Sequence, residues 1–334
     1  MDRRRNPQVK KQLAKFRQIA AVLHFYLRFL PSFTQLGFVA RRFFWSVPKT
    51  DFRGQHWLVT GGSGGLGRSV VCAALRGGAT VTVAARSAEK LHALIAELAA
   101  AGLEGADTER CDFTLIAETE ALIARLAAQG RAIDVLVNNV GVLNDELLVT
   151  REGLEASFVS NLLSHYQLTE GLIDRGLLQS GSVVVNVTSG GAYHFPLSAA
   201  MLNVTDPARY RGVAAYGFHK RAQMALNRYW NEIHHDRGIM FYVMHPGWAD
   251  TAGVQRSLPR FRRVLKSILR DADSGADTII WLVAHRPAQP AEELVWFDRK
   301  IRPAHVYAHT RHTTEDGRSL ASVLQTTLSD RRHS

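Results

Sequence analysis

Two hydrophobic patterns divide the chain into an N-terminal arm and a longer body. In the body, short apolar runs alternate with stretches in which apolar residues recur every three or four positions. Strands that lead into turns are predicted at 55–62, 79–86 and 133–141, with helices at 67–78 and 87–102. This alternation is typical of an α/β fold in which a doubly wound parallel sheet carries helices on both faces.

The order of these elements predicts one domain with appendages. No sequence repeat, low-complexity tract or interdomain linker interrupts the body. We expect an arm over 1–50, a domain over 51–302 and a C-terminal tail over 303–334. The tail is polar and charged, which predicts a peripheral segment with a short helix near 319–328.

A helical stripe runs along the arm. Its apolar residues, spaced alternately four and three positions apart, are Val9, Leu13, Phe16, Ala20, Leu23, Leu27 and Leu30. Pro31 is expected to interrupt the helix, and Arg28 argues against both a bilayer span and a secretory signal. The basic, aromatic arm fits peripheral membrane contact through residues 9–45 or packing on its own domain or a second subunit. An organellar presequence is a third, lesser alternative.

Charge is concentrated in this arm. Residues 1–50 contain eleven Lys and Arg residues and one acid, whereas the remainder contains 30 basic and 29 acidic residues. A nearly neutral body argues against nucleic-acid binding. Cys72 and Cys111 have no disulfide or metal-ligand spacing, which favours a reducing, cytoplasmic location, with membrane association left open by the arm. The histidines also lack metal-ligand spacing, so no metal is expected.

A glycine-rich turn, TGGSGGLG at 60–67, lies between the first predicted strand and helix. Glycines there let the backbone approach a pyrophosphate, which the N-terminus of the following helix favours. The register is open, because Gly62, Gly64 and Gly67 also fit G-x-G-x-x-G. The strand–turn–helix context predicts a dinucleotide site.

The end of the second predicted strand indicates which dinucleotide binds. An acid there would bond the ribose hydroxyls of NAD, but the sequence has Ala84-Ala85-Arg86. Arg86 can bind a 2′-phosphate. NADP(H) is therefore favoured over NAD(H).

Tyr216 and Lys220 are spaced to lie one turn apart on one helix face. A lysine cation beside a tyrosine is expected to pull the phenol pKa below its usual value of about 10. Such a tyrosine can give a proton to a carbonyl oxygen or take one from an alcohol. Exposed Tyr/Lys pairs at this spacing arise often by chance, so the pair alone does not indicate catalysis and needs its structural context.

With TGxxxGxG at 60–67, NNVG at 138–141 and YxxxK at 216–220, residues 55–285 resemble the short-chain dehydrogenase/reductase family. The resemblance implies a Rossmann-type fold and hydride transfer with a nicotinamide cofactor. The segments HPGWADTAGV, SGADTIIWL and WFDRK, together with the arm, resemble the member-12 type of this family.

The resemblance also implies roles for individual residues. Tyr216 would be the acid or base, Lys220 would lower its pKa and hold the nicotinamide ribose, Ser189 would orient the substrate oxygen and Asn161 would position a water. Asp112 would contact adenine. The residues expected at the cofactor are Thr60, Gly61, Ser63, Gly65, Leu66, Gly67, Arg86, Asp112, Asn138, Gly141, Tyr216, Lys220, Pro246, Gly247 and Thr251.

Two features depart from the usual family pattern. Val140 replaces an alanine and would crowd the adenosine side of the pocket. Ser189 and Tyr216 lie 27 positions apart, and the intervening segment 191–212 resembles the insertion of retinol-dehydrogenase-like members. We expect this segment to be a substrate lid, with Tyr193, His194 and Phe195 shaping the pocket.

The expected pocket residues are mostly apolar: Val142, Leu143, Tyr193, Phe195, Met201 and Trp248. They favour a small apolar aldehyde, ketone or alcohol as substrate. Two alternatives remain: a nonoxidative enzyme such as an epimerase or dehydratase, and a membrane-associated NADP(H)-binding interaction protein. Members of the family commonly form dimers or tetramers, so a homo-oligomer is compatible with the sequence.

Overall fold

A computed structural model describes residues 28–250, 255, 259–288 and 294–332. One sheet of eight strands runs through the described part, in the order β3-β2-β1-β4-β5-β6-β7-β8. All neighbouring strands are parallel except β7 and β8. The strands are β1 (His56–Thr60), β2 (Thr80–Ala85), β3 (Ala106–Arg110), β4 (Val135–Asn138), β5 (Val183–Val187), β6 (Met240–Met244), β7 (Leu294–Phe297) and β8 (Lys300–Pro303). The expected doubly wound parallel sheet of Rossmann type is confirmed, with an antiparallel strand added at one edge.

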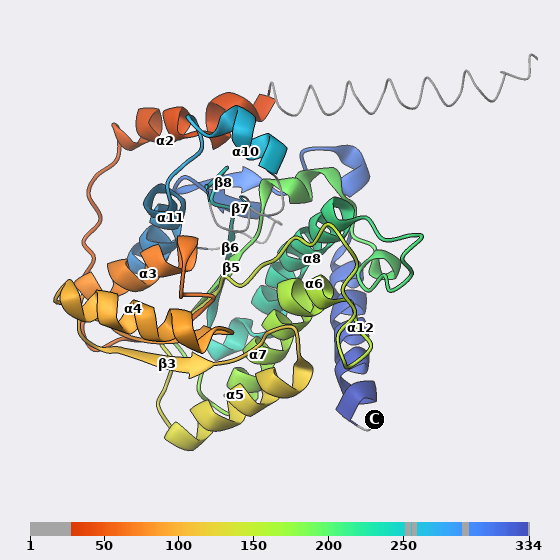
Figure 1. The fold of residues 1–334 in the computed structure, drawn as a ribbon, viewed down its shortest axis with the longest axis horizontal. Helices are drawn as coiled ribbons and strands as arrows, with labels where there is room; N and C mark the ends of the chain where they lie inside the picture. Colours follow the sequence, from red (N-terminus) through yellow and green to blue (C-terminus); the bar gives the residue numbers. More distant parts are fainter. Residues whose placement is uncertain (1–27, 251–254, 256–258, 289–293, 333–334) are drawn as a thin grey trace, which may run out of the picture.

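The central strands are buried along their whole length because helices cover both faces (Figure 1). The helices on one face are α3 (Gly65–Arg76), α4 (Ala88–Ala100) and α11 (Ala272–His285). Those on the other face are α5 (Ile116–Gln129), α7 (Ser164–Asp174) and α8 (Gly212–Ile233). The smaller helices are α6 (Ala156–Phe158), the π-helical turn η1 (Val159–Leu163) and α10 (Pro259–Leu265).

The C-terminal tail is not peripheral. It forms α12 (Thr314–Arg332), which lies along α8 (Figure 1). Four of its apolar residues are buried in the main core with α5, α7 and α8: Leu320, Ala321, Leu324 and Leu328. The expectation of a peripheral tail with a short helix was wrong, because this stripe covers an apolar helix face that would otherwise meet water.

The described part of the arm packs on the domain. Residues 28–33 are helical, so Pro31 does not interrupt the helix as expected, and the break comes at Thr34. The chain then forms α2 (Gln35–Arg42), and the break allows both Phe33 and Phe38 to face the protein interior. The predicted stripe from Val9 to Leu27 lies outside the described residues.

Candidate active site

The expected site residues gather at the carboxyl ends of β1, β4, β5 and β6. In the strand order, β1 continues to β2 on one side and to β4 on the other, so the connections diverge between β1 and β4. Open parallel sheets bind ligands in the crevice at such a point. The fold therefore brings the glycine turn, the 138–141 segment and the catalytic candidates together at the carboxyl ends of the central strands.

The glycine turn has the backbone form of a phosphate cradle. Gly61 and Gly65 have φ angles of +67° and +52°, which favour glycine. A Cβ on Gly67 would lie 2.5 Å from the carbonyl oxygen of Gly61, so the helix can approach the turn only without a side chain there. Gly64 has an extended φ of −173° and open space beside it. Glycine is thus required at Gly61 and Gly65 by the backbone angle and at Gly67 by the lack of space for a side chain.

Thr60 joins this turn to the segment after β4. Its buried hydroxyl donates to the Val137 carbonyl (3.2 Å) and accepts from the amides of Asn139 (2.9 Å) and Val140 (3.1 Å). The Asn139 side chain donates back to the Thr60 carbonyl at 2.9 Å. These hydrogen bonds fix the start of the glycine turn to residues 137–140.

The Asn138 side chain serves the sheet instead. It is fully buried and its amide donates to Asn186 Oδ1 (2.9 Å) and Thr169 Oγ1 (3.0 Å), joining β4, β5 and α7. Leu66 is also buried, packing under α11 beside Gly275. Both side chains are occupied by this packing. Asn138 and Leu66 can therefore contact a cofactor only through their main-chain atoms.

Arg86 and Asp112, the residues expected at the adenosine end of a cofactor, follow strands β2 and β3. Arg86 is exposed at the end of β2, and Ser63 is half-buried in the glycine turn. Asp112 is half-buried and its Oδ1 accepts from the amide (3.0 Å) and hydroxyl (2.8 Å) of Thr114. Val140 Cγ2 lies 3.1 Å from where a Cβ on Gly61 would be, which places it against the glycine turn.

Tyr216 and Lys220 lie one turn apart on α8, as predicted. The Lys220 Nζ is 5.6 Å from the centre of the Tyr216 ring and donates to the Val187 carbonyl at 2.8 Å. Ser189 follows β5, and its hydroxyl accepts from the Gly191 amide at 3.2 Å. A Cβ on Gly141 would lie 3.3 Å from Lys220 Nζ, so glycine leaves room for the ammonium.

The expected lowering of the Tyr216 pKa by Lys220 was wrong. Burial raises the pKa of Tyr216, and the hydrogen bond from Ser189 only partly opposes this. Burial also lowers the pKa of Lys220 to about 7. A lysine that is largely neutral above pH 7 provides little positive charge to stabilise a phenolate.

Asn161 lies in the π-helical turn η1 and is fully buried. Its side chain accepts from the Val142 amide (2.7 Å) and donates to the Val142 carbonyl (2.8 Å), and its own carbonyl accepts from Gln223 Nε2 (2.6 Å). π-Turns within helices often occur at functional sites. Asn161 therefore holds the loop beside Gly141, and its expected role in positioning a water stays a prediction.

The segment after β6 forms the far wall of the crevice. Gly247 has a φ of +74°, and a Cβ there would lie 2.6 Å from Arg270 Nε. Pro246 and Trp248 are half-buried on either side of it. Thr251, expected to complete this segment, lies outside the described residues.

The 191–212 insertion packs over the loop that follows β4. Tyr210 donates to the Asn144 carbonyl at 3.0 Å, and Asn203 accepts from the Glu155 amide at 2.9 Å. Tyr193, expected to line the pocket, is instead buried in a core cluster and stacks on Phe29 with ring centres 5.6 Å apart. That part of the expectation was wrong, because the arm offers Tyr193 an apolar neighbour away from the crevice.

Sequence reasoning missed several residues that shape this site. Thr188 donates to the Lys220 carbonyl at 2.7 Å, and Gln223 bonds both Asn161 and His165. Arg221 is buried and donates to the carbonyls of Ala192, Phe195 and Ala304, which fixes the insertion to α8. No sequence pattern singles out these residues, since their partners come from distant segments.

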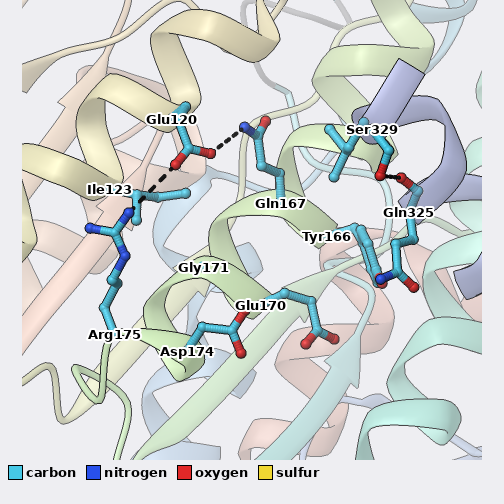
Figure 2. A pocket seen from close by; sticks show the side chains of 11 residues that line it. Glu120, Ile123, Tyr166, Gln167, Glu170, Gly171, Asp174, Arg175, Gln325 and Ser329 are labelled. Carbon is cyan, nitrogen blue, oxygen red and sulfur yellow. Dashed lines mark hydrogen bonds and ion pairs between the residues drawn. The ribbon is translucent and has the colours of Figure 1, made fainter. Parts of the chain in front are cut away.

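A cavity of about 310 Å³ lies elsewhere, between α5, α7 and α12. Figure 2 shows that Glu120 bonds both Gln167 and Arg175 at its edge. None of the catalytic candidates lines it. Within the described ranges, no group of three or more His, Cys, Asp or Glu side chains could hold a metal ion, and no helix is long and apolar enough to cross a bilayer.

Comparison with known proteins agrees with this geometry. A sequence model described as short chain dehydrogenase matches residues 55–260. The dehydrogenase/reductase SDR family member 12 of Bos taurus is 32% identical over 280 residues, covering 81% of this chain and 86% of the relative. Human retinol dehydrogenase 13 is 25% identical over 250 residues, covering 74% and 73%. A Burkholderia cenocepacia short chain dehydrogenase crystallised with NADP has the same fold, with a TM-score of 0.57 and 24% identity over 70% of this chain and 92% of that one. The chain belongs to the short-chain dehydrogenase/reductase family of oxidoreductases.

Proposed function

We propose that the protein is an NADP(H)-dependent oxidoreductase that interconverts a small apolar aldehyde or ketone with its alcohol. The observation that carries the proposal is the placement of Tyr216 and Lys220 one turn apart on α8, with Lys220 Nζ bonded to the carbonyl of Val187 at the carboxyl end of β5, the strand that Ser189 follows. These groups fit acid–base work on a single oxygen atom.

In reduction, the Tyr216 hydroxyl donates its proton to the carbonyl oxygen of the substrate, and in oxidation the phenolate takes the proton back. The raised pKa of Tyr216 suits the first direction, because it keeps the phenol protonated at neutral pH. Ser189 orients the same oxygen and stabilises the negative charge that develops on it. Lys220 holds the cofactor ribose and exchanges protons with Tyr216, for which a pKa of about 7 is well placed.

The cofactor, when bound, supplies or accepts the hydride. The glycine turn at 61–67 fits its pyrophosphate, because five of its seven residues are glycine and it leads into the N-terminus of α3. Arg86 is exposed at the end of β2 and fits a 2′-phosphate, which supports NADP(H) over NAD(H). The NADP-complexed structural neighbour is consistent with this choice.

The apolar character of the substrate rests on the half-buried side chains around the site. Val142 and Leu143, in the loop after β4, and Met201, in the insertion, are half-buried and apolar. None of the three is basic, which favours an apolar substrate over an acidic one. The similarity to a retinol dehydrogenase supports an apolar alcohol or aldehyde.

The test is NADPH and NADH consumption by the purified protein over a panel of apolar aldehydes and ketones. We expect turnover with NADPH that disappears in Tyr216→Phe. A product formed without net change in NADPH would instead support a nonoxidative enzyme. Tight NADPH binding without turnover on any compound of the panel would favour the interaction protein, and the absence of nucleotide binding would overturn the proposal.

We also propose that the arm contacts a membrane surface. Five apolar side chains in the segment 36–47 are 54% to 91% exposed: Leu36, Val39, Phe43, Phe44 and Val47. Arg42 and Lys49 beside them are exposed and basic, which suits anionic lipid. Phe43→Ser/Phe44→Ser should reduce co-sedimentation with phosphatidylserine vesicles, whereas Val323→Ser, at an exposed apolar site on α12, should not. Equal sedimentation of all three proteins would exclude this contact.

A further inference from the structure

We propose that the N-terminal arm positions the wall of the crevice that faces the nicotinamide end of the cofactor. This inference rests on the proposed function and concerns Arg41, Arg270 and Asp298 as positioning residues. Asp298 belongs to the WFDRK segment and Arg41 to the arm, whereas Arg270 lies outside the segments that carry the family resemblance. They connect helix 28–33, the 246–248 segment and the turn between β7 and β8.

One carbonyl group of the arm, that of Phe33, bonds directly to segment 246–250, which we call the wall. The Phe33 carbonyl accepts from the Trp248 amide at 2.9 Å and from Arg270 Nε at 2.9 Å. It lies at the end of helix 28–33, where backbone carbonyls have no partner within the helix and carry partial negative charge. The arm thus provides an acceptor for the residue that follows Gly247.

Arg270 holds the other side of the same wall. Its Nη1 donates to the Pro246 carbonyl at 3.3 Å, and its own backbone amide and carbonyl pair with Trp248 and Asp250 at 2.8 Å each. The Arg270 side chain is 1% exposed and lies against the rings of Phe38 and Phe297. Segment 246–250 is therefore fixed by one buried arginine on one side and by the arm on the other.

Asp298 determines where that arginine sits. Its carboxylate accepts from Arg270 Nη1 at 2.6 Å and Nη2 at 2.9 Å, and from Arg41 Nε at 2.7 Å. Asp298 and Arg299 form the two-residue turn between β7 and β8, with φ angles of +50° and +58°, as a tight hairpin turn with positive φ at both positions requires. The turn therefore fixes the backbone that carries the Asp298 carboxylate.

Arg41, in α2 of the arm, links Asp298 to the end of helix 28–33. Besides Asp298 it bonds the carbonyl of Ser32, which also accepts from Arg270 Nη2 at 2.9 Å. Two guanidinium groups thus share one carboxylate and the last carbonyls of helix 28–33. Such bidentate, charge-assisted bonds have strict geometry, so a shift of the arm is transmitted to Arg270 and then to Gly247.

Space at Gly247 makes the wall sensitive to that shift. A Cβ on Gly247 would lie 2.6 Å from Arg270 Nε and 2.8 Å from the Phe33 carbonyl oxygen. The backbone of the wall, the arginine and the arm are thus packed without spare room. If Arg41 is removed, we expect the wall to lose its fixed position while the glycine turn at 61–67, on the other side of the site, is unaffected.

The experiment compares two ligands by isothermal titration calorimetry. NADPH occupies both ends of the crevice, whereas 2′,5′-ADP occupies only the adenosine end. We expect Arg41→Gln to raise the Kd for NADPH by about tenfold and to leave the Kd for 2′,5′-ADP within about twofold. Arg125→Gln, which removes a half-exposed ion pair with Glu109 far from the arm, should change neither value.

Arg41→Lys provides a conservative comparison. It keeps a charge for Asp298 but lacks the fork that reaches Ser32, so its effect should fall between wild type and Arg41→Gln. An unchanged NADPH Kd in Arg41→Gln would overturn the inference. Equal weakening of both ligands would also overturn it, since that result indicates general destabilisation. If wild type binds neither ligand, the proposed function fails first, and that outcome is distinct from either result.

Discussion

Lys220 holds its ammonium nitrogen 5.6 Å from the centre of the Tyr216 ring, one turn further along α8. The lysine is buried, and its Nζ donates to the Val187 carbonyl. The pair therefore keeps a protonated phenol beside an amine whose pKa is close to neutrality, an arrangement ready to release a proton when a carbonyl oxygen arrives.

Tyr216→Phe should lower kcat by about a thousandfold, because it removes the proposed acid while keeping the ring. Ser189→Ala should lower kcat by about a hundredfold, through loss of one donor to the substrate oxygen. Steady-state kinetics with a substrate identified from the panel measures both. The NADPH Kd of Tyr216→Phe should stay close to wild type, and an active Tyr216→Phe enzyme would remove this residue from the mechanism.

Lys220→Met should be more stable than wild type at pH 6.5, and this difference should shrink as the pH rises toward 10. Burial lowers the pKa of Lys220 in the folded state to about 7, from its ordinary value of 10.5. Between these values the unfolded state binds more protons, so wild-type stability rises with pH relative to the variant. Urea unfolding at several pH values measures the difference, and a pH-independent difference would contradict the shift.

Gly67→Ala should reduce the free energy of unfolding by about 1–3 kcal/mol, since its methyl group would meet the Gly61 carbonyl and the Asn139 amide. Gly64→Ala is the matched control within the same turn. Its φ is extended and nothing lies within 4 Å, so the free energy should change by no more than about 0.5 kcal/mol. Similar losses in both variants would show that the turn is not packed as described.

Arg86→Gln should raise the KM for NADPH by about 10- to 100-fold and leave the KM for NADH nearly unchanged, because only the former has a 2′-phosphate for the guanidinium. Arg76→Gln is the control, since Arg76 is also an exposed arginine but lies at the C-terminal end of α3, the end away from the glycine turn. If both cofactors lose affinity equally in Arg86→Gln, Arg86 does not select between them.

The sequence was sufficient for the parts of the site that depend on local order. The strand–turn–helix at 56–76 and the one-turn spacing of Tyr216 and Lys220 follow from periodicity and glycine placement alone. The family resemblance then predicted that they belong to one cofactor and catalytic site.

What could not be predicted depends on partners far along the chain. The pKa of Tyr216 depends on how deeply α8 is covered, which its own residues do not reveal. Tyr193 is a core residue because Phe29 and Phe33 lie against it, and α12 is a core helix because α8 leaves an apolar face open. Arg270 and Asp298 are 28 positions apart and have no recognisable spacing.

The bond between Phe33 and Arg270 spans 237 positions of sequence, and that between Ser46 and Arg299 spans 253. During synthesis at the usual speed of a ribosome, the arm must therefore wait about 10–50 s before its partners emerge. Throughout that interval Phe33 and Phe38, which end up almost fully buried, have no domain to cover them. The bonds between the arm and residues 270 and 299 can therefore form only after nearly the whole domain has been synthesised.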